Sequence, residues 1–216
     1  MKKYKPKTRE ELKSLVDNLS INLSDIDTSA ITDMSWLFYK NERKDFSGIE
    51  NWDVSSVTDM SMMFLGCDNF NQPLNNWNVS SVIYMNEMFD GCKNFNQPLN
   101  NWDVSSVTDM SMMFIYCHNF NQPLNSWDVS SVTNMDGMFA GCKNFNQSLN
   151  SWDVSSVTKM NSMFIGCKNF NQPLNSWDVS SVTDMSMMFL GCDTFNQPLD
   201  SWKDKLSQKL AGVIDE

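Results

Sequence analysis

The chain has 216 residues, with 16 Lys and Arg against 26 Asp and Glu, which gives a formal net charge of −10 at pH 7. This acidic balance argues against duplex nucleic acid and anionic membrane surfaces as partners, because both are bound through Lys and Arg. No apolar run approaches the ~18 residues of a membrane-spanning helix, so we expect no membrane insertion.

The N-terminus is basic in the way that a signal peptide begins. Its cationic residues are Lys2, Lys3, Lys5, Lys7 and Arg9. No apolar run of about seven residues follows, as a secretory signal would require. The sequence as written therefore predicts a cytoplasmic protein.

Residues 1–26 are expected to form an N-terminal helical cap. Thr8 and Glu11 have the spacing of a capping box, in which a hydroxyl and a carboxylate each satisfy a backbone N–H. One helical face then collects Leu12, Leu15, Val16 and Leu19.

The centre of the chain is an internal repeat. Tryptophan returns every 25 residues at Trp52, Trp77, Trp102, Trp127, Trp152, Trp177 and Trp202. Six full units follow one another: 51–75, 76–100, 101–125, 126–150, 151–175 and 176–200. An atypical copy, 27–50, precedes them, so we expect one repeat array over 27–200.

Each unit reads as one short strand followed by one helical turn. Leu74, Trp77 and Val79 have the L-x-x-L-x-L spacing of a strand with alternating faces. Ser81 is placed to cap a helical turn whose apolar stripe is Val82, Met85, Met88 and Phe89.

Three further features close the unit. Gly91 allows the chain to leave the helical turn, and Cys92 and Phe95 are expected to point inward. The Asn96-Gln97-Pro98 segment then makes the corner before the next strand.

A unit of this size cannot bury its apolar face alone, so the repeats must stack with their Trp, Phe and Met side chains in continuous ladders. The predicted fold class is α/β, a right-handed LRR-like parallel solenoid of about seven 25-residue coils with helical caps at both ends. The alternative is a parallel β-helix. The C-terminal helical cap is expected over 201–216, with Leu206, Leu210 and Val213 on its apolar face.

The repeat F-N-Q-x-L-x-x-W-D-V-S-x-V-T-x-M-x-x-M-F-x-G-C, over about residues 27 to 202, resembles that of the BspA-type leucine-rich-repeat surface proteins. More narrowly, it is similar to a domain of unknown function common in bacterial surface lipoproteins. The chain departs from the usual leucine-rich pattern by having Val82 where an Asn is expected. The resemblance implies a surface adhesin that binds host proteins, located at the cell surface or outside the cell.

The residue pattern gives little indication of a catalytic site or a metal site. One cysteine occurs per regular repeat, at Cys67, Cys92, Cys117, Cys142, Cys167 and Cys192. Without a close C-x2-4-C pair these are expected to be reduced, buried core thiols. The single histidine, His118, follows Cys117 at a variable turn position, so we expect neither catalysis nor a cofactor or metal.

The most site-like feature is the outward face of the predicted strands, which we call the Asp column. Its residues are Asp53, Asn78, Asp103, Asp128, Asp153 and Asp178, with Asn or Ser two positions before and Ser two positions after each of them. The column is a candidate surface for a basic protein partner, a weak Ca²⁺ site, or a polar face whose Asp-x-Ser units make turns onto their own backbone.

The sequence therefore predicts a monomeric, non-enzymatic, protein-binding repeat scaffold that uses the Asp column. The alternative is a structural or decoy array without a specific ligand. A second candidate surface lies on the variable helical turns, at Tyr84, Glu87, Asn134 and Lys159.

Overall fold

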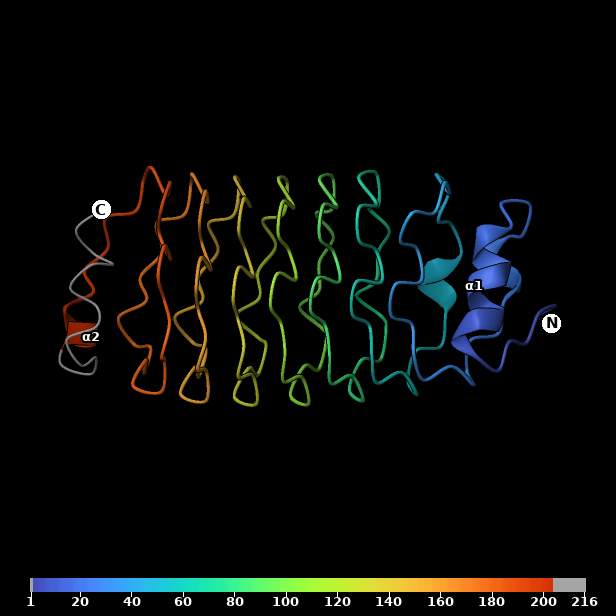
Figure 1. Ribbon diagram of the computed structural model, residues 1–216, viewed down its shortest axis with the longest axis horizontal. Helices are drawn as coiled ribbons and strands as arrows, with labels where there is room; N and C mark the ends of the chain where they lie inside the picture. The colour runs from blue at the N-terminus through green and yellow to red at the C-terminus, as the bar shows by residue number, and fades with distance from the viewer. Residues whose placement is uncertain (1, 204–216) are drawn as a thin grey trace.

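A computed structural model describes residues 2–203 of the chain. The regular elements are α1 (Arg9–Asp17), the 3-10 turns η1 (Leu23–Asp25) and η2 (Ile49–Asn51), and α2 (Asp200–Lys203). Between α1 and α2 the chain winds through successive loops that stand in a row, with α1 at one end of the row and α2 at the other (Figure 1).

The predicted α/β, LRR-like parallel solenoid is wrong, and so is the alternative parallel β-helix. Over residues 27–199 the structure has neither an α-helix nor a strand, and neighbouring repeats share only isolated parallel β-bridges. These bridges join Asp33, Asp59, Tyr84, Asp109, Asn134, Lys159 and Asp184 in succession. The repeats are loops built almost entirely of turns.

The W-x-V segment does not form a strand because tight turns enclose it. The N–H of Trp77 bonds to the carbonyl of Leu74 at 3.0 Å, and the N–H of Val82 bonds to the carbonyl of Val79 at 2.9 Å. Only a few residues remain between the two turns. A strand needs a longer extended run that pairs with its neighbour.

The M-x-x-M-F segment does not form a helical turn because its hydrogen bonds run to the next loop. Glu87 and Gly91 have positive φ angles of 55° and 72°, which a right-handed helix cannot contain. The bonds from this segment are Met85 N–H to Asp109 O (3.1 Å), Glu87 to Ser111 (2.9 Å), Phe89 to Met113 (3.0 Å) and Gly91 to Ile115 (2.9 Å). Gly91, which was expected to let the chain leave a helical turn, instead takes a left-handed backbone conformation within this chain of turns.

The inward-facing residues were predicted correctly although their secondary structure was not. The apolar positions assigned between residues 74 and 95 are at most 3 % exposed: Leu74, Trp77, Val79, Val82, Met85, Met88, Phe89, Cys92 and Phe95. The side chains stack on their own copies. The rings of Trp102, Trp127 and Trp152 lie 6.4 Å apart with planes within 2° of parallel.

The N-terminal end of the row is closed by α1. Thr8 Oγ1 accepts the N–H of Glu11 at 3.2 Å, and the Glu11 carboxylate accepts the N–H of Lys7 at 2.6 Å, one residue before the expected position. Leu12 and Val16 are fully buried against the first loop, whereas Leu19 lies beyond the helix and is 52 % exposed.

At the other end, α2 places Trp202 against the preceding loop with 2 % of its surface exposed. The rest of the predicted C-terminal cap, from residue 204 onward, lies outside the described residues.

Candidate functional site

The carboxylates of the Asp column are held by the serine two residues later. Asp103 Oδ1 accepts the N–H of Ser105 at 3.1 Å and its hydroxyl at 2.6 Å, and Asp128 accepts the same two donors of Ser130 at 3.0 and 2.7 Å. This local turn is the Asp-x-Ser arrangement anticipated from the sequence. It fixes one carboxylate oxygen of each aspartate against its own backbone.

These hydrogen bonds also keep the column charged. The Ser105 hydroxyl and N–H lower the pKa of Asp103, and Ser130 lowers the pKa of Asp128 in the same way. For Asp153 the bonds from Ser155 again lower the pKa, while the neighbouring carboxylates act weakly in the opposite direction. Asp53, Asp103, Asp128 and Asp153 are therefore ionised at neutral pH, whereas Asn78 carries no charge.

A hollow of about 280 Å³ opens on this face between two consecutive repeats. It is lined by Asn150, Ser151, Trp152, Asp153, Val154, Ser176 and Asp178. The structure thus brings Asp153 and Asp178 of the Asp column together at one depression, along with two of their flanking serines. Asp53, Asn78, Asp103 and Asp128 lie outside it.

A second set of Asp-x-Ser turns was missed from the sequence. Asp59 Oδ1 accepts the N–H of Ser61 at 2.8 Å, and Asp109 accepts that of Ser111 at 2.8 Å. These aspartates belong to the column that makes the parallel β-bridges. The D-M-S spacing in the sequence is the signal that identifies them, but it lies in the segment assigned to a helical turn.

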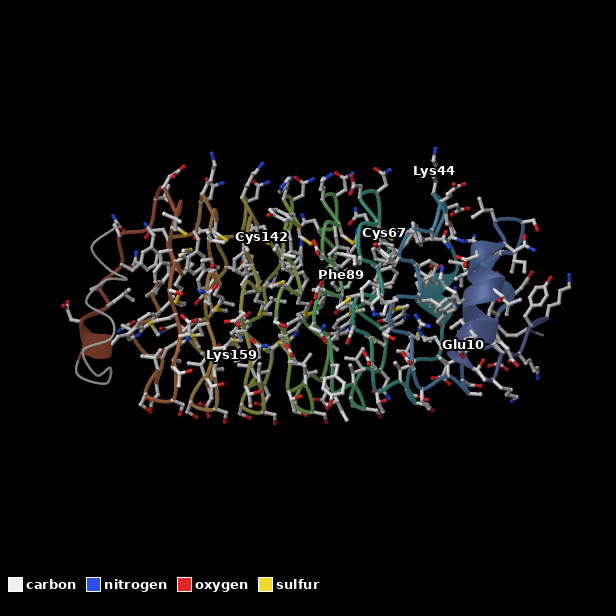
Figure 2. The ribbon with its side chains drawn as sticks, in the orientation of Figure 1. Glu10, Lys44, Cys67, Phe89, Cys142 and Lys159 are labelled. Carbon is white, nitrogen blue, oxygen red and sulfur yellow. The ribbon has the colours of Figure 1, made fainter. Side chains whose placement is uncertain are left out.

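The alternative surface on the variable turns is spread over different environments. Tyr84 is 46 % exposed and Lys159 is exposed, but both share the bridge column with Asn134. Glu87 is half-buried at a left-handed backbone position. Figure 2 shows Lys159 on one side of the row and the labelled cysteines on the other.

The cysteines are thiols that bond to the loop before them. Cys117 Sγ donates to the carbonyl of Phe89 at 3.0 Å, and Cys142 Sγ donates to that of Phe114 at 2.9 Å. Cys92, Cys117, Cys142 and Cys167 are buried, and burial raises the pKa of each of these thiols. A buried, protonated thiol is a poor nucleophile.

His118 is not positioned to activate Cys117. The Cys117 thiol bonds to the Phe89 carbonyl, while the His118 ring lies edge-on to Tyr116 with the two ring centres 6.4 Å apart. Partial burial, followed by the charges of Lys143 and Lys93, lowers the pKa of His118. Within residues 2–203 no group of three or more His, Cys, Asp or Glu is arranged to hold a metal ion.

Comparison with known proteins gives one family. The model described as "Mycoplasma protein of unknown function, DUF285" matches the chain twice, over residues 10–126 and 113–215. The two successive matches agree with a repeat-containing protein. No curated protein and no solved structure matches the chain. Among the described residues, no helix has the length and apolar character needed to cross a membrane.

Proposed function

We propose that this chain, which belongs to the DUF285 family of Mycoplasma proteins of unknown function, is a non-enzymatic scaffold that binds another protein. The observation that carries the proposal is the Asp column. Asp103, Asp128 and Asp153 are exposed, and each is oriented by the serine two residues later. A row of preoriented charges loses little conformational entropy when a partner binds.

The partner should present a basic patch. The carboxylate oxygens of Asp103 and Asp128 that do not face serine make no hydrogen bond within residues 2–203, so they remain available as acceptors. Lys and Arg side chains are the matching donors. Attraction between opposite surface charges chiefly accelerates association and weakens as salt is added.

The resemblance to BspA-type surface proteins supports a finer version of this proposal. In that version the chain is an adhesin displayed at the cell surface that contacts host proteins. It rests on the F-N-Q block, which begins at residues 70, 95, 120, 145, 170 and 195, and on the W-D-V-S block, which begins at residues 52, 102, 127, 152 and 177.

A second candidate is a structural array without a specific ligand. The same Asp-x-Ser turns favour this candidate. Each aspartate accepts the backbone N–H of the serine in its own loop, so the loop would need the aspartate even without a ligand.

The two candidates differ in what the negative charge does. Changing Asp103, Asp128, Asp153 and Asp178 together to Asn keeps an acceptor oxygen for each serine and removes four charges. We expect the variant to fold as before and to bind a protein captured by the wild type about tenfold or more weakly, mainly through a slower association rate.

The matched control changes four carboxylates away from the column, Asp59, Asp109, Asp184 and Asp193, to their amides. It should retain affinity within about twofold if the position of the charges, and not the net charge, matters. Unchanged affinity in the Asp-column variant would move the interaction to Tyr84, Glu87, Asn134 and Lys159. Weaker binding by the control alone would point to the bridge column, which Asp59, Asp109 and Asp184 share with three of these residues. Failure to capture any protein would favour the structural array.

A further inference from the structure

The last described loop of the row carries a line of backbone donors that have no acceptor among residues 2–203. In the preceding loop, the N–H groups of Met160, Ser162, Phe164 and Gly166 donate to the carbonyls of Asp184, Ser186, Met188 and Leu190 at 2.8–3.0 Å. The equivalent N–H groups one repeat later belong to Met185, Met187, Phe189 and Gly191. These four have no acceptor within residues 2–203.

The donors point the same way because the peptide units are aligned along the row. In each unit the carbonyl of one residue accepts a bond from the loop before, while the following N–H donates to the loop after, as at Asp59 and Met60. Four such columns run through the regular repeats. Two columns run in the opposite direction, one of which joins Thr108 N–H to Ile83 O. Because four columns point their N–H groups toward the C-terminal end of the row and only two point the other way, that end carries a partial positive charge, as a helix N-terminus does.

The same end is also incompletely buried. Val182, Phe189, Phe195 and Leu199 are only partly buried, whereas their counterparts in the preceding repeat are fully buried. Met187 and Leu190 are 57 % and 48 % exposed. We call the surface formed by these residues and the four donors the terminal face.

A second capped copy of this chain does not match the terminal face. Two terminal faces would oppose donors to donors. The acceptor end of the row is closed by α1, where Arg9 Nε donates to the carbonyl of Ser35 at 2.5 Å. The Arg9 guanidinium is favourable at the acceptor end, because the carbonyl groups of the aligned peptides give that end a partial negative charge.

A further loop of the same repeat is complementary to the donors and apolar side chains of the terminal face. Such a loop offers carbonyls at alternate positions, as 184–190 offer them to the loop before. It also carries Phe side chains in register, as in the stacking of Phe164 on Phe189 with 5.8 Å between ring centres. We propose that the terminal face binds a 25-residue repeat of this type, with no helix covering its acceptor side, supplied by another polypeptide. Backbone pairing of this kind is a general mode of peptide recognition.

The test uses the full chain and a synthetic peptide of residues 176–200, which contains the required carbonyls. Amide hydrogen exchange is followed by NMR at Met185, Met187, Phe189 and Gly191. Without peptide these amides should exchange roughly a hundredfold or more faster than those of Met160, Ser162, Phe164 and Gly166. Saturating peptide should slow the same four amides at least tenfold, and a scrambled peptide should not.

Two variants test whether the peptide binds at the terminal face. Met187→Asp places a charge on the terminal face and should weaken peptide binding about tenfold or more. Met112→Asp is the control, since Met112 occupies the same exposed, left-handed position in the middle of the row, with φ of 54° against 55°. It should leave binding unchanged.

Three results would overturn the proposal. One is slow exchange of the four amides in the chain alone, because the terminal face would then already be covered. The second is peptide binding that leaves those amides unaffected. The third is equal weakening by Met187→Asp and Met112→Asp.

Discussion

Core side chains both stack on their copies and donate hydrogen bonds to the neighbouring loop, as Trp127 shows. Its ring lies between those of Trp102 and Trp152, with 6.4 Å to each ring centre. Its indole N–H also donates to the carbonyl of Leu99 in the loop before, at 2.9 Å. The ladder was predicted from the 25-residue spacing, but the hydrogen bond was not.

Trp127→Ala should therefore destabilise the protein by about 3–5 kcal/mol, because it opens a cavity and leaves the buried Leu99 carbonyl without its donor. Urea unfolding measures the loss. Trp36→Ala is the control, since Trp36 is 38 % exposed and should cost less than about 1 kcal/mol. Similar losses in both variants would contradict a buried ladder.

Asp90 is the one charged residue in a column otherwise occupied by Leu65, Ile115, Ala140, Ile165 and Leu190. Its carboxyl is half-buried. Burial, and secondarily the charge of Glu87, raises its pKa from 3.8 to about 6. The folded protein therefore holds this proton more tightly than the unfolded chain does.

Because the folded-state pKa is raised, stability should fall as the pH rises from about 4 to about 6. Asp90→Asn removes the titration and should stabilise the protein at pH 7 by about 1 kcal/mol, after allowance for solvent screening. The free energy of unfolding between pH 4 and 7 measures this. Asp103→Asn is the control: its pKa is lowered, so its effect lies below pH 4. An unchanged pH slope in Asp90→Asn would refute the assignment.

At the scale of the repeat element, two left-handed residues define each turn. One column carries Met62, Glu87, Met112, Gly137, Ser162 and Met187, and the other carries glycine except at Tyr116. The left-handed region is unfavourable for residues with a Cβ atom. In the second column, a Cβ added at Gly141 would lie 2.7 Å from Cδ1 of Tyr116, whereas one added at Gly66 would meet nothing within 4 Å.

Gly141→Ala should therefore cost more than Gly66→Ala, although their φ angles of 71° and 74° impose the same backbone strain. We expect about 1 kcal/mol for Gly66→Ala and about 1 kcal/mol more for Gly141→Ala. Repeating Gly141→Ala in a Tyr116→Gly background should abolish the excess, which a double-mutant cycle in urea reports. Equal costs at both glycines would show that the Tyr116 ring does not constrain the turn.

The sequence predicted which residues of a repeat are buried but not how the backbone bends. The spacing of Val82, Met85, Met88 and Phe89 fits a helical stripe, and it fits equally a chain of turns whose bonds go to the neighbouring loop. A single repeat does not distinguish the two, because the partners of these bonds lie about 24 residues away. Gly91 marked its left-handed position, but the residue types at 87 and 162 carry no such signal.

For the candidate site, too, features set by residues close in the sequence could be predicted, and features set by neighbouring loops could not. The Asp column and its Asp-x-Ser turns could be predicted, because both depend on residues two apart in the sequence. The hollow between Asp153 and Asp178 could not, since it depends on the shape of two neighbouring loops.

At the scale of the whole molecule, stability comes from the junctions between consecutive loops. Besides the backbone columns, each regular junction repeats the same side-chain bonds. Asn96 Oδ1 accepts the N–H of Asn121 at 3.0 Å, and Asn121 Oδ1 accepts that of Asn146 at 3.0 Å. Each loop thus contacts its two neighbours in the same way, and the register of 25 residues is what keeps every bond in place.

Deleting the whole repeat 101–125 should therefore do less harm than deleting its first half, 101–112. The long deletion joins Asn100 to Ser126, which occupies the same position in its repeat as Asn101, so every remaining loop finds an equivalent neighbour. The short deletion leaves a remnant, 113–125, that cannot close a loop, and it separates the units 76–100 and 126–150. We expect one unfolding transition at a lower midpoint for the long deletion. For the short one we expect either two transitions or no cooperative transition, as seen by tryptophan fluorescence in urea. Comparable, cooperative unfolding of both deletions would mean that the junctions do not depend on the 25-residue register.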